Sequence, residues 1–421
     1  MRGRQLDKPA SVAGHAPLRL FLAAGVLLFN VAAQAAHPEI GERIEVRVED
    51  LPAPYASESA SNPSRLIERT AGATLKVPDG FEANTFASGF DNPRWMTVAA
   101  NGDVLVADAR VGRITSLRDD DGDGRAEITE TFAAGRRYPH GMAIRDGYLY
   151  VTDLDNIWRY DYRDGQLTAS GRPQAMLPRG SLGGGGGHST RTLAISPDGR
   201  RFYVAIGSRG NIAEEDPPRA TVQVFDLDGG GQRTFASGLR NPVGIAFRPG
   251  GDSLYVVVNE RDGVGDEMVP DYLTRIEDGD FFGWPYAYLG PNPQPGYGDR
   301  RPDLVARTKL PDVLFRSHSA PIGLVFYDGG SFPDDYRGDA FVALRGSWNA
   351  AVPRGYMIVR VPFENGRPAG GYQVFATGFW ERGENTASVW GRPAGLAVAA
   401  DGSLLIADDT GGVIWRISYA N

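Results

Sequence analysis

Two kinds of side chain in this sequence suggest chemistry on an anionic ligand. His188 follows five consecutive glycines in "GGGGGHST", and Arg240 and Arg392 each stand directly before a short apolar segment. Guanidinium groups pair with carboxylates in bidentate fashion, and an imidazole can accept a proton near neutral pH. Because a lone histidine in a loop is more often a hydrogen-bonding group than a base, the role of His188 depends on what surrounds it.

A phrase that recurs six times predicts how these residues are positioned. The copies are "DNPRWMTV", "YPHGMAI", "HSTRTLAI", "RNPVGIAF", "SAPIGLVF" and "GRPAGLAV", which end at Val98, Ile144, Ile195, Phe247, Phe326 and Val398. Short strands and Asp-Gly turns repeating at about 40–50 residues are typical of propeller blades, whereas solenoid repeats are shorter and mostly helical. We therefore expect an all-β fold, a six-bladed β-propeller of four-stranded antiparallel blades, in which "FEANTFA" and the C-terminal "GGVIWRISY" share one blade.

Equivalent positions of propeller blades surround one axis, so the residues before each repeated strand should meet at one mouth. Those positions hold Asn92, Tyr138, His188, Arg240, Asn241, Ser319 and Arg392. Four copies contain Pro-x-Gly, which fixes the entry to the strand, and His140 lies inside one of them, so we expect it to be structural. The third copy has Thr190-Arg191-Thr192 instead, next to His188. A functional site or a degenerate repeat would each explain this departure.

Several other uses of the glycine run are excluded. No Gly-Lys-Ser/Thr follows it, as a phosphate-binding loop requires, and no Gly-x-Ser-x-Gly elbow indicates a serine hydrolase. A slack linker is excluded because the run lies inside a predicted blade. The remaining interpretation is a loop without side chains that brings His188 to the axial mouth, where a ligand can approach the backbone closely.

Longer motifs resemble a known family. "GHSTRTLAISPDGRRFYVAIGSRGN", "GLRNPVGIAF", "NERDGVGDE" with "GDFFGWPY", and "GRPAGLAVAADGSLLIADD" are similar to the soluble glucose/sorbosone dehydrogenases that depend on pyrroloquinoline quinone (PQQ). The resemblance covers about residues 75–420. It implies a six-bladed propeller that binds PQQ over its axis together with calcium and oxidises aldoses or related sugar aldehydes.

The resemblance also assigns roles to individual residues. His188 would be the general base, and Arg240 would polarise the quinone, to which the sugar's hydride passes. The implied cofactor-binding residues are Arg240, Asn241, Arg261, Arg345 and Arg392, and the carbonyls of Asp262 and Gly263 would bind the cofactor's calcium. One departure concerns Ser208, which stands where the glucose-oxidising members carry an acid that orients the histidine. Another group must then orient His188, or activity and selectivity must differ.

A second metal site is suggested by "DDDGDGRAEITE". Asp119, Asp121, Asp123 and Glu130 follow the spacing of oxygen ligands in a calcium-binding EF-hand loop. The flanking segments have strand patterns, so the site would be a calcium loop between strands. An acidic turn held by its own side-chain hydrogen bonds is an equal alternative.

Composition and the N-terminus suggest where the protein works. Residues 1–35 have basic residues, an apolar run and Ala33-Gln34-Ala35, the pattern of a cleaved signal peptide; an uncleaved anchor is the alternative. We expect a linker over 36–74 and the propeller over 75–421, in a secreted, periplasmic protein that does not stay inserted in the membrane after cleavage. The 421 residues have a net charge of −8, which argues against nucleic acid, and no cysteine, which excludes disulfides and thiol chemistry.

Two other functions use the same scaffold. A metal-dependent lactonase would need acidic and amide ligands around one axial ion, whereas the mouth positions supply arginines. A non-catalytic propeller would bind a peptide or glycan, because fold alone does not determine function. The particular sugar, the electron acceptor and the oligomeric state are not indicated by the sequence.

Overall fold

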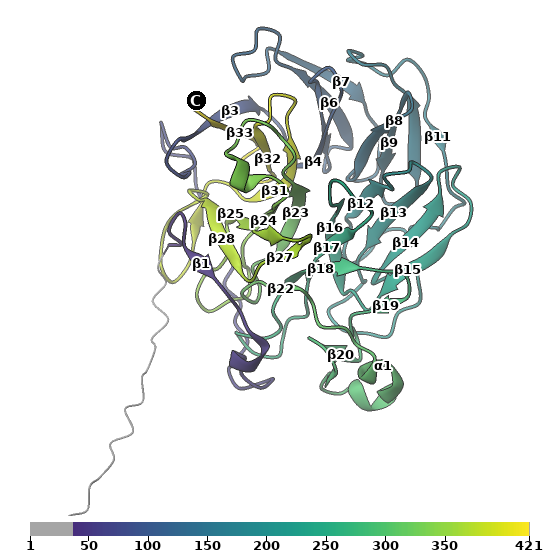
Figure 1. Cartoon of the computed structure of the whole chain (residues 1–421), viewed down its shortest axis with the longest axis vertical. Coiled ribbons are helices and arrows are strands. Elements are labelled where there is room, and N and C mark those ends of the chain that lie inside the picture. Colours follow the sequence, from purple (N-terminus) through teal and green to yellow (C-terminus); the bar gives the residue numbers. More distant parts are fainter. Residues whose placement is uncertain (1–36, 421) are drawn as a thin grey trace, which may run out of the picture. The chain divides into compact units, whose positions relative to one another are not determined.

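The computed structural model describes residues 37–420, and the predicted signal peptide lies outside the described residues. The described chain is almost entirely β-structure, arranged mainly in six sheets of four or five strands (Figure 1). This confirms the predicted all-β class. The helices are α1 (Pro302–Ala306) and the short 3-10 turns η1 (Val48–Asp50), η2 (Gly298–Arg300) and η3 (Asp334–Tyr336). No described helix has the length and apolar character needed to span a membrane.

Three sheets take their main strands from residues 93–237. The first contains β4 (Pro93–Val98), β5 (Val104–Asp108), β6 (Arg113–Arg118) and β7 (Ile128–Ala133). The second contains β8 (Met142–Arg145), β9 (Tyr148–Thr152), β10 (Ile157–Asp161) and β11 (Gln174–Ala175). The third contains β12 (Arg191–Ile195), β13 (Arg201–Ile206), β14 (Thr221–Asp226) and β15 (Arg233–Ser237), with β19 (Asp280–Phe281) added in parallel.

The other three sheets come from the second half, with strands borrowed from the N-terminal side. The fourth contains β16 (Asn241–Phe247), β17 (Leu254–Asn259), β18 (Tyr272–Ile276) and β22 (Val313–Leu314). The fifth contains β23 (Pro321–Phe326), β24 (Ala340–Leu344), β25 (Met357–Val361), β28 (Tyr372–Ala376) and β1 (Arg43–Ile44). The sixth contains β31 (Pro393–Val398), β32 (Leu404–Asp408), β33 (Val413–Tyr419) and β3 (Phe81–Ser88).

Small additions complete the strand inventory. They are the sheet of β2 (Arg65–Leu66), β30 (Ser388–Val389) and β29 (Trp380–Arg382), and the hairpins β20 (Ala287–Tyr288) with β21 (Asn292–Pro293) and β26 (Phe363–Glu364) with β27 (Arg367–Pro368). The expected linker therefore contributes strands: β1 pairs with β28, and its Ile44 is buried. A pairing of only two residues leaves too little periodicity to be predicted from sequence.

The repeated phrases form the innermost strand of each large sheet. These strands, β4, β8, β12, β16, β23 and β31, contact one another in chain order, and β31 contacts β4 again (Figure 1). The glycine of Pro-x-Gly permits this closeness: a Cβ on Gly323 would lie 2.1 Å from the Ala394 carbonyl of the next inner strand, and one on Gly395 would lie 2.6 Å from the Arg94 carbonyl. The residues between proline and glycine meet as a small apolar cluster of Val243, Ile322 and Ala394.

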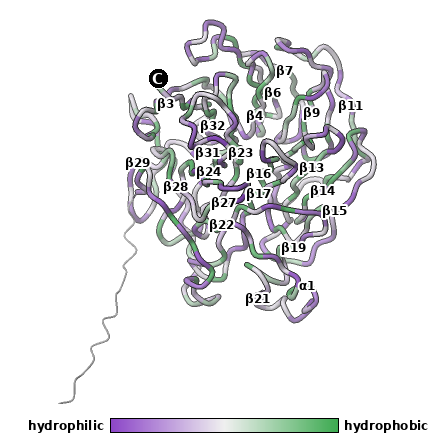
Figure 2. The backbone as a smooth tube through the Cα atoms, in the orientation of Figure 1, coloured by the Kyte–Doolittle hydropathy of each residue, from purple (hydrophilic) through white to green (hydrophobic). Residues whose placement is uncertain are grey.

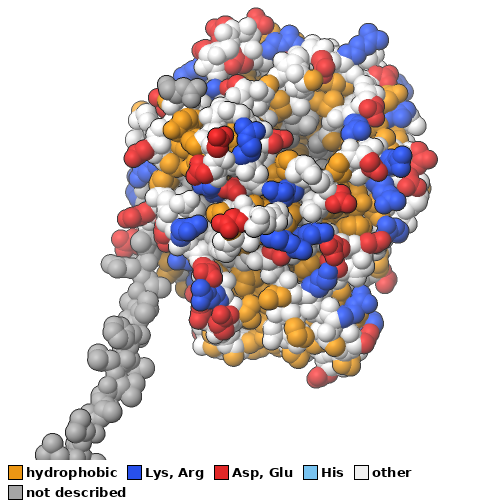
Figure 3. Space-filling model, viewed as in Figure 1, with side chains coloured by type: hydrophobic (Ala, Val, Ile, Leu, Met, Phe, Trp, Pro, Cys, Tyr) orange, Lys and Arg blue, Asp and Glu red, His pale blue; other side chains and the backbone are white. Residues whose placement is uncertain are grey.

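Hydrophobic cores lie between neighbouring sheets. Trp95 and Leu105 of the first sheet pack with Met142 and Leu149 of the second, and five further clusters join the other neighbouring pairs in the same way. Hydrophobic stretches recur along the strands in Figure 2, and acidic and basic side chains are interspersed over the face seen in Figure 3. Packing between the sheets thus brings the inner strands together, and the loops that connect their ends can form a site.

Candidate active site

One pocket contains six of the predicted site residues. It has a volume of about 270 Å³ and lies where the loops before β16 and β31 meet those after β17 and β24. The predicted residues that line it are His188, Arg240, Asn241, Asp262, Arg345 and Arg392. The unpredicted ones include Asn259, Glu260, Asp271, His318, Trp348 and Asn349. The repeated phrase therefore predicted residues that the structure brings together at one end of the inner strands.

His188 is held by the residue that stands in place of the family's acid. Its Nδ1 lies 2.9 Å from the Ser208 carbonyl oxygen and 3.1 Å from the Ser208 hydroxyl, which itself donates to the Gly210 carbonyl at 2.6 Å. A carbonyl can only accept, so the imidazole proton is on Nδ1. This leaves Nε2 unprotonated and available as a proton acceptor.

The surroundings of His188 keep the imidazole neutral. Burial and then the charge of Arg240 lower its pKa to about 4, against the opposing hydrogen bond to Ser208. His140 is different: it is fully buried against the Trp95 ring, with Nδ1 3.2 Å from the Thr192 hydroxyl, and it does not line the pocket. The structural role predicted for His140 agrees with this position.

The depressed pKa of His188 predicts a pH dependence of stability. Between about pH 6.5 and pH 4 the unfolded chain binds a proton at His188 that the folded protein excludes, so the free energy of unfolding falls as the pH is lowered through this window. Urea denaturation at a series of pH values measures it. The decline should be shallower in His188→Gln, which keeps the contribution of buried His140. Identical slopes for the two proteins would contradict the prediction.

Two of the three pocket arginines are held by acidic side chains. Arg240 donates to the Asp262 carboxylate at 3.2 Å and to the Asn211 carbonyl and side-chain oxygens, both at 3.1 Å. Arg345 makes a bidentate pair with the buried Asp409, at 2.7 and 3.0 Å. Asp409 also pairs with Arg94, and these cations hold the pKa of its carboxyl well below the usual range. Both guanidinium groups are therefore fixed in position.

Arg392 gives the pocket its excess positive charge. Its guanidinium donates to the carbonyls of Arg345, at 3.0 Å, and Gly346, and pairs with no carboxylate of the described residues. Burial and the nearby Arg345 lower its pKa to about 10, so it is still protonated at neutral pH. An uncompensated buried cation favours an anionic ligand.

Two buried carboxyl groups in the pocket lining differ in charge, because only Asp271 is ionised at neutral pH. Burial raises the pKa of Glu260 to about 8, so it is protonated at neutral pH, and it raises that of Asp271 to about 6. Asp271 accepts the backbone N–H groups of Glu260 and Ala320, each at 2.8 Å. It therefore positions two mouth loops. The side-chain oxygen of Asn241 is buried without a hydrogen-bond partner in the described structure, which leaves an acceptor for a ligand.

Two residues predicted to bind the cofactor or its calcium, Arg261 and Gly263, lie outside the pocket lining, as do the mouth positions Asn92, Tyr138 and Ser319. Arg261 points its Nε to the Asp262 carbonyl at 3.3 Å, and Gly263 follows in the same loop. The Asp262 carbonyl also accepts from the Asn211 amide at 2.8 Å. Arg261 and Asn211 therefore already donate to the Asp262 carbonyl. Calcium binding by the carbonyls of Asp262 and Gly263 stays a prediction.

The structure adds a group that sequence analysis missed. His318 lies 3.1 Å from the Asn349 amide and 3.5 Å from Asp262, with Nδ1 the nearer nitrogen, and its pKa is raised by Asp262 and Asp271 against the effect of burial. His318 immediately precedes the fifth mouth position, Ser319, which could have drawn attention to it. Asp409 likewise follows "LLIAD", the strand end facing the sixth mouth loop.

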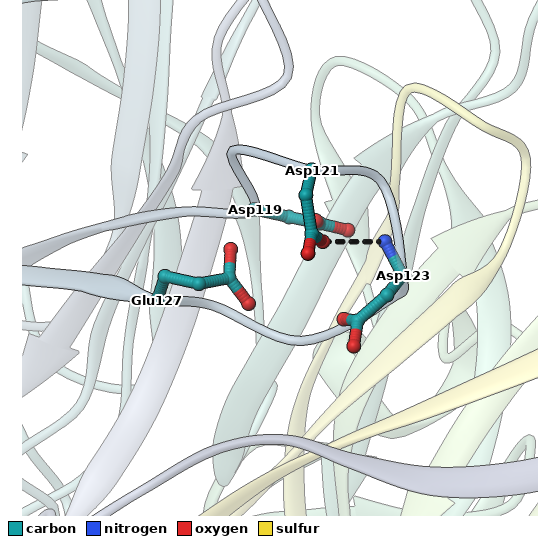
Figure 4. Close-up of side chains that lie close together, drawn as sticks. All are labelled: Asp119, Asp121, Asp123 and Glu127. Carbon is teal, nitrogen blue, oxygen red and sulfur yellow. Dashed lines mark hydrogen bonds between the residues drawn. The ribbon is translucent and has the colours of Figure 1, made fainter.

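The predicted calcium loop brings four carboxylates together. Oxygens of Asp119, Asp121, Asp123 and Glu127 lie within 4.8 Å of one another (Figure 4). Glu127 takes the place expected for Glu130, which lies on β7 opposite Ser116. The reason is that β7 begins at Ile128, so the loop is three residues shorter than an EF-hand loop that leads into a helix.

Comparison with known proteins identifies the family of this chain. The TrAA12-like family model matches residues 75–272 and 302–420, and the chain belongs to this family. A PQQ-dependent pyranose dehydrogenase of Coprinopsis cinerea is 26% identical over 417 residues, covering 82% of this chain and 54% of the relative. The chain thus spans about half the length of that enzyme.

Two further similarities concern a bacterial protein and a solved structure. An uncharacterized protein of Borreliella burgdorferi is 28% identical over 362 residues, covering 82% of this chain and 91% of the relative. The holo PQQ domain of the Coprinopsis cinerea pyranose dehydrogenase superposes with a TM-score of 0.70 at 23% identity, over 85% of this chain and 100% of the domain. The fold is therefore shared with that domain.

Proposed function

We propose that this protein is a PQQ-dependent dehydrogenase that oxidises an aldose or a related sugar aldehyde, and that its six sheets are the blades of a β-propeller. The observation that carries the proposal is the pocket itself, where a neutral His188 with a free Nε2 lines the same cavity as three arginines, one of them unpaired. PQQ is a planar tricarboxylate, and bidentate guanidinium donors suit its charge and shape. The names of the relatives support the same cofactor and substrate class.

The protein's own residues supply binding and proton transfer. Arg240, Arg345 and Arg392 would hold the cofactor's carboxylates and oxygens, and His188 Nε2 would accept the proton of the sugar's anomeric hydroxyl. The imidazolium that forms is stabilised through Nδ1–H by the Ser208 carbonyl. When bound, PQQ supplies the two-electron acceptor for the hydride of the anomeric carbon. Trp348, 52% exposed at the pocket, offers an apolar face to a sugar ring.

The sequence argued against a metal-dependent lactonase because the mouth positions supply arginines. The structure adds a second argument, which concerns where the carboxylates converge. Carboxylates do line the pocket, but within residues 37–420 the one group of three or more that converges on a point is the Asp119 loop, whose residues do not line it. The direct test adds PQQ and calcium to the purified protein and measures cofactor fluorescence quenching and dye reduction with a panel of aldoses. Lactone hydrolysis without PQQ, or no PQQ binding, would overturn the proposal.

We propose that the protein is exported and works outside the cytoplasm, in the periplasm or beyond the cell. The support is the signal-peptide pattern over residues 1–35.

We also propose that the Asp119 loop binds calcium. Added calcium should raise the melting temperature of the wild type, because an ion that binds only the folded state stabilises it by mass action. Asp121→Ala combined with Asp123→Ala should abolish the increase, whereas Asp146→Ala, an exposed acid elsewhere, should not. If the double variant keeps both the calcium stoichiometry and the thermal shift, the loop is only a turn.

A further inference from the structure

Two buried cations donate hydrogen bonds to the backbone carbonyl of His188. Arg191 and Arg219 are 0% and 2% exposed, and neither forms an ion pair with a carboxylate of residues 37–420. Both guanidinium groups instead donate to backbone carbonyls. We propose that Arg191 and Arg219 are positioning residues that hold the Gly183–Gly187 loop and the backbone of His188, and so fix the imidazole for proton transfer. The part concerning catalysis rests on the proposed function.

One guanidinium nitrogen of Arg219 donates hydrogen bonds to three carbonyls of the Gly183–Gly187 loop. Its NH2 group donates to the carbonyls of Gly183, Gly184 and Gly185 at 3.0, 2.9 and 3.0 Å. Its NH1 group donates to the carbonyls of His188, at 3.3 Å, and Gly207, at 3.2 Å. One side chain therefore ties the glycine run to the backbone of the histidine.

Arg191 completes the arrangement from strand β12. Its Nε donates to the Leu182 carbonyl at 3.0 Å and its NH2 group to the Gly184 carbonyl at 2.8 Å. Its NH1 group donates to the carbonyls of His188, at 3.0 Å, and Thr190, at 2.6 Å. The His188 and Gly184 carbonyls thus accept from both arginines. Hydrogen bonds to charged donors are stronger than neutral ones, so the position of His188 is over-determined.

The five glycines are explained by this wrapping. Gly183, Gly184, Gly186 and Gly187 have φ angles of 73°, 63°, 89° and 64°, which side chains disfavour, and successive turns of this kind point the carbonyls inward. A Cβ on Gly187 would lie 2.3 Å from the Arg209 backbone. The glycine run therefore encloses protein cations, a reason for these glycines that the sequence analysis did not consider.

The test compares Arg219→Gln with Arg219→Lys in the full-length protein. We expect Arg219→Gln to lower kcat at least about tenfold, because small displacements of a catalytic group are costly, while the Kd for PQQ changes less than threefold. The lysine variant should recover part of the loss, because it restores a cation. In the cofactor-free protein, the ¹³C-histidine NMR signal of His188, assigned with His188→Gln, should shift or broaden in Arg219→Gln while that of His140 stays in place.

Two controls separate positioning from general stability. Arg360→Gln removes an arginine that is also mostly buried and paired with Asp339, and should destabilise the protein without moving the His188 signal. If Arg219→Gln does not fold, Gly184→Ala replaces it, because its Cβ meets no atom within 4 Å and only the backbone is strained. Gly180→Ala is the match, with φ of 92° and equal space, and its carbonyl accepts from the Gly183 N–H and not from an arginine.

The outcomes are distinct. An unchanged His188 signal in Arg219→Gln, or in Gly184→Ala relative to Gly180→Ala, would overturn the proposal. A shifted signal with an intact kcat would also overturn it, because the arrangement would then not serve catalysis. If the wild type lacks dehydrogenase activity, the proposed function fails, and the NMR comparison still decides whether these arginines hold His188.

Discussion

His188→Ala is expected to bind PQQ about as tightly as the wild type and to turn over at least about a hundredfold more slowly. The loss corresponds to the lower range for removing a general base. Binding should persist because the pocket arginines are held independently of the imidazole, Arg345 by Asp409 and Arg240 by Asp262 and Asn211. Aldose-dependent dye reduction measures turnover, and fluorescence quenching of PQQ measures binding.

The comparison variant is His140→Ala. This histidine is fully buried beside Trp95, so its removal should lower the melting temperature and leave kcat of the folded fraction within a fewfold of the wild type. Full activity of His188→Ala would show that His188 is not the base, and His318, the other histidine in the pocket, would be examined next.

Arg240→Ala should weaken PQQ binding by about ten- to a hundredfold. A hydrogen bond to a charged group contributes about 1.5–3 kcal/mol, and 1.4 kcal/mol is tenfold in affinity. The substitution also leaves the partly buried Asp262 carboxylate without its 3.2 Å partner, which places a negative charge where the cofactor's carboxylates would bind. Titration of the cofactor-free variant with PQQ gives the Kd.

Arg118→Ala is the matched control for this prediction. It removes a bidentate pair with the buried Asp103 in the first sheet, away from the pocket. Its effect should be confined to stability. Equal PQQ affinity for Arg240→Ala and the wild type would remove Arg240 from the cofactor-binding set, whatever the stability of the variant.

The arrangement of the inner strands could be predicted from the sequence because the same phrase occurs once in each of the six large sheets. All six phrases form the innermost strands, and the segment at Phe81 pairs with that at Tyr419 as expected. A repeat also identifies equivalent positions, which is why His188, Arg240 and Arg392 were found together. Glycine and proline at fixed places in the phrase have one physical cause, the close approach of adjacent inner strands.

The residues that hold the site residues in place do not belong to the repeated phrase, so they could not be predicted from sequence spacing. Asn211, His318 and Asp409 come from three different loops, and each acts on a residue far away in the chain. Arg219 lies 31 residues after His188, and its partners are carbonyls, which leave no trace in residue types. The glycine run showed that close packing was needed there, but not whether protein or ligand would fill the space.

The pairing of β3 with β33 has a consequence for biosynthesis. Phe81 lies opposite Tyr419, so a strand made early must wait for nearly the entire chain before its partner exists. Until then β3 has an open edge able to pair with another chain, and closing so long a loop slows folding. A ribosome that stops short of residue 413 would release a chain in which the sixth sheet cannot join its two ends. Any chain that ends before β33 therefore keeps this edge of β3 unpaired.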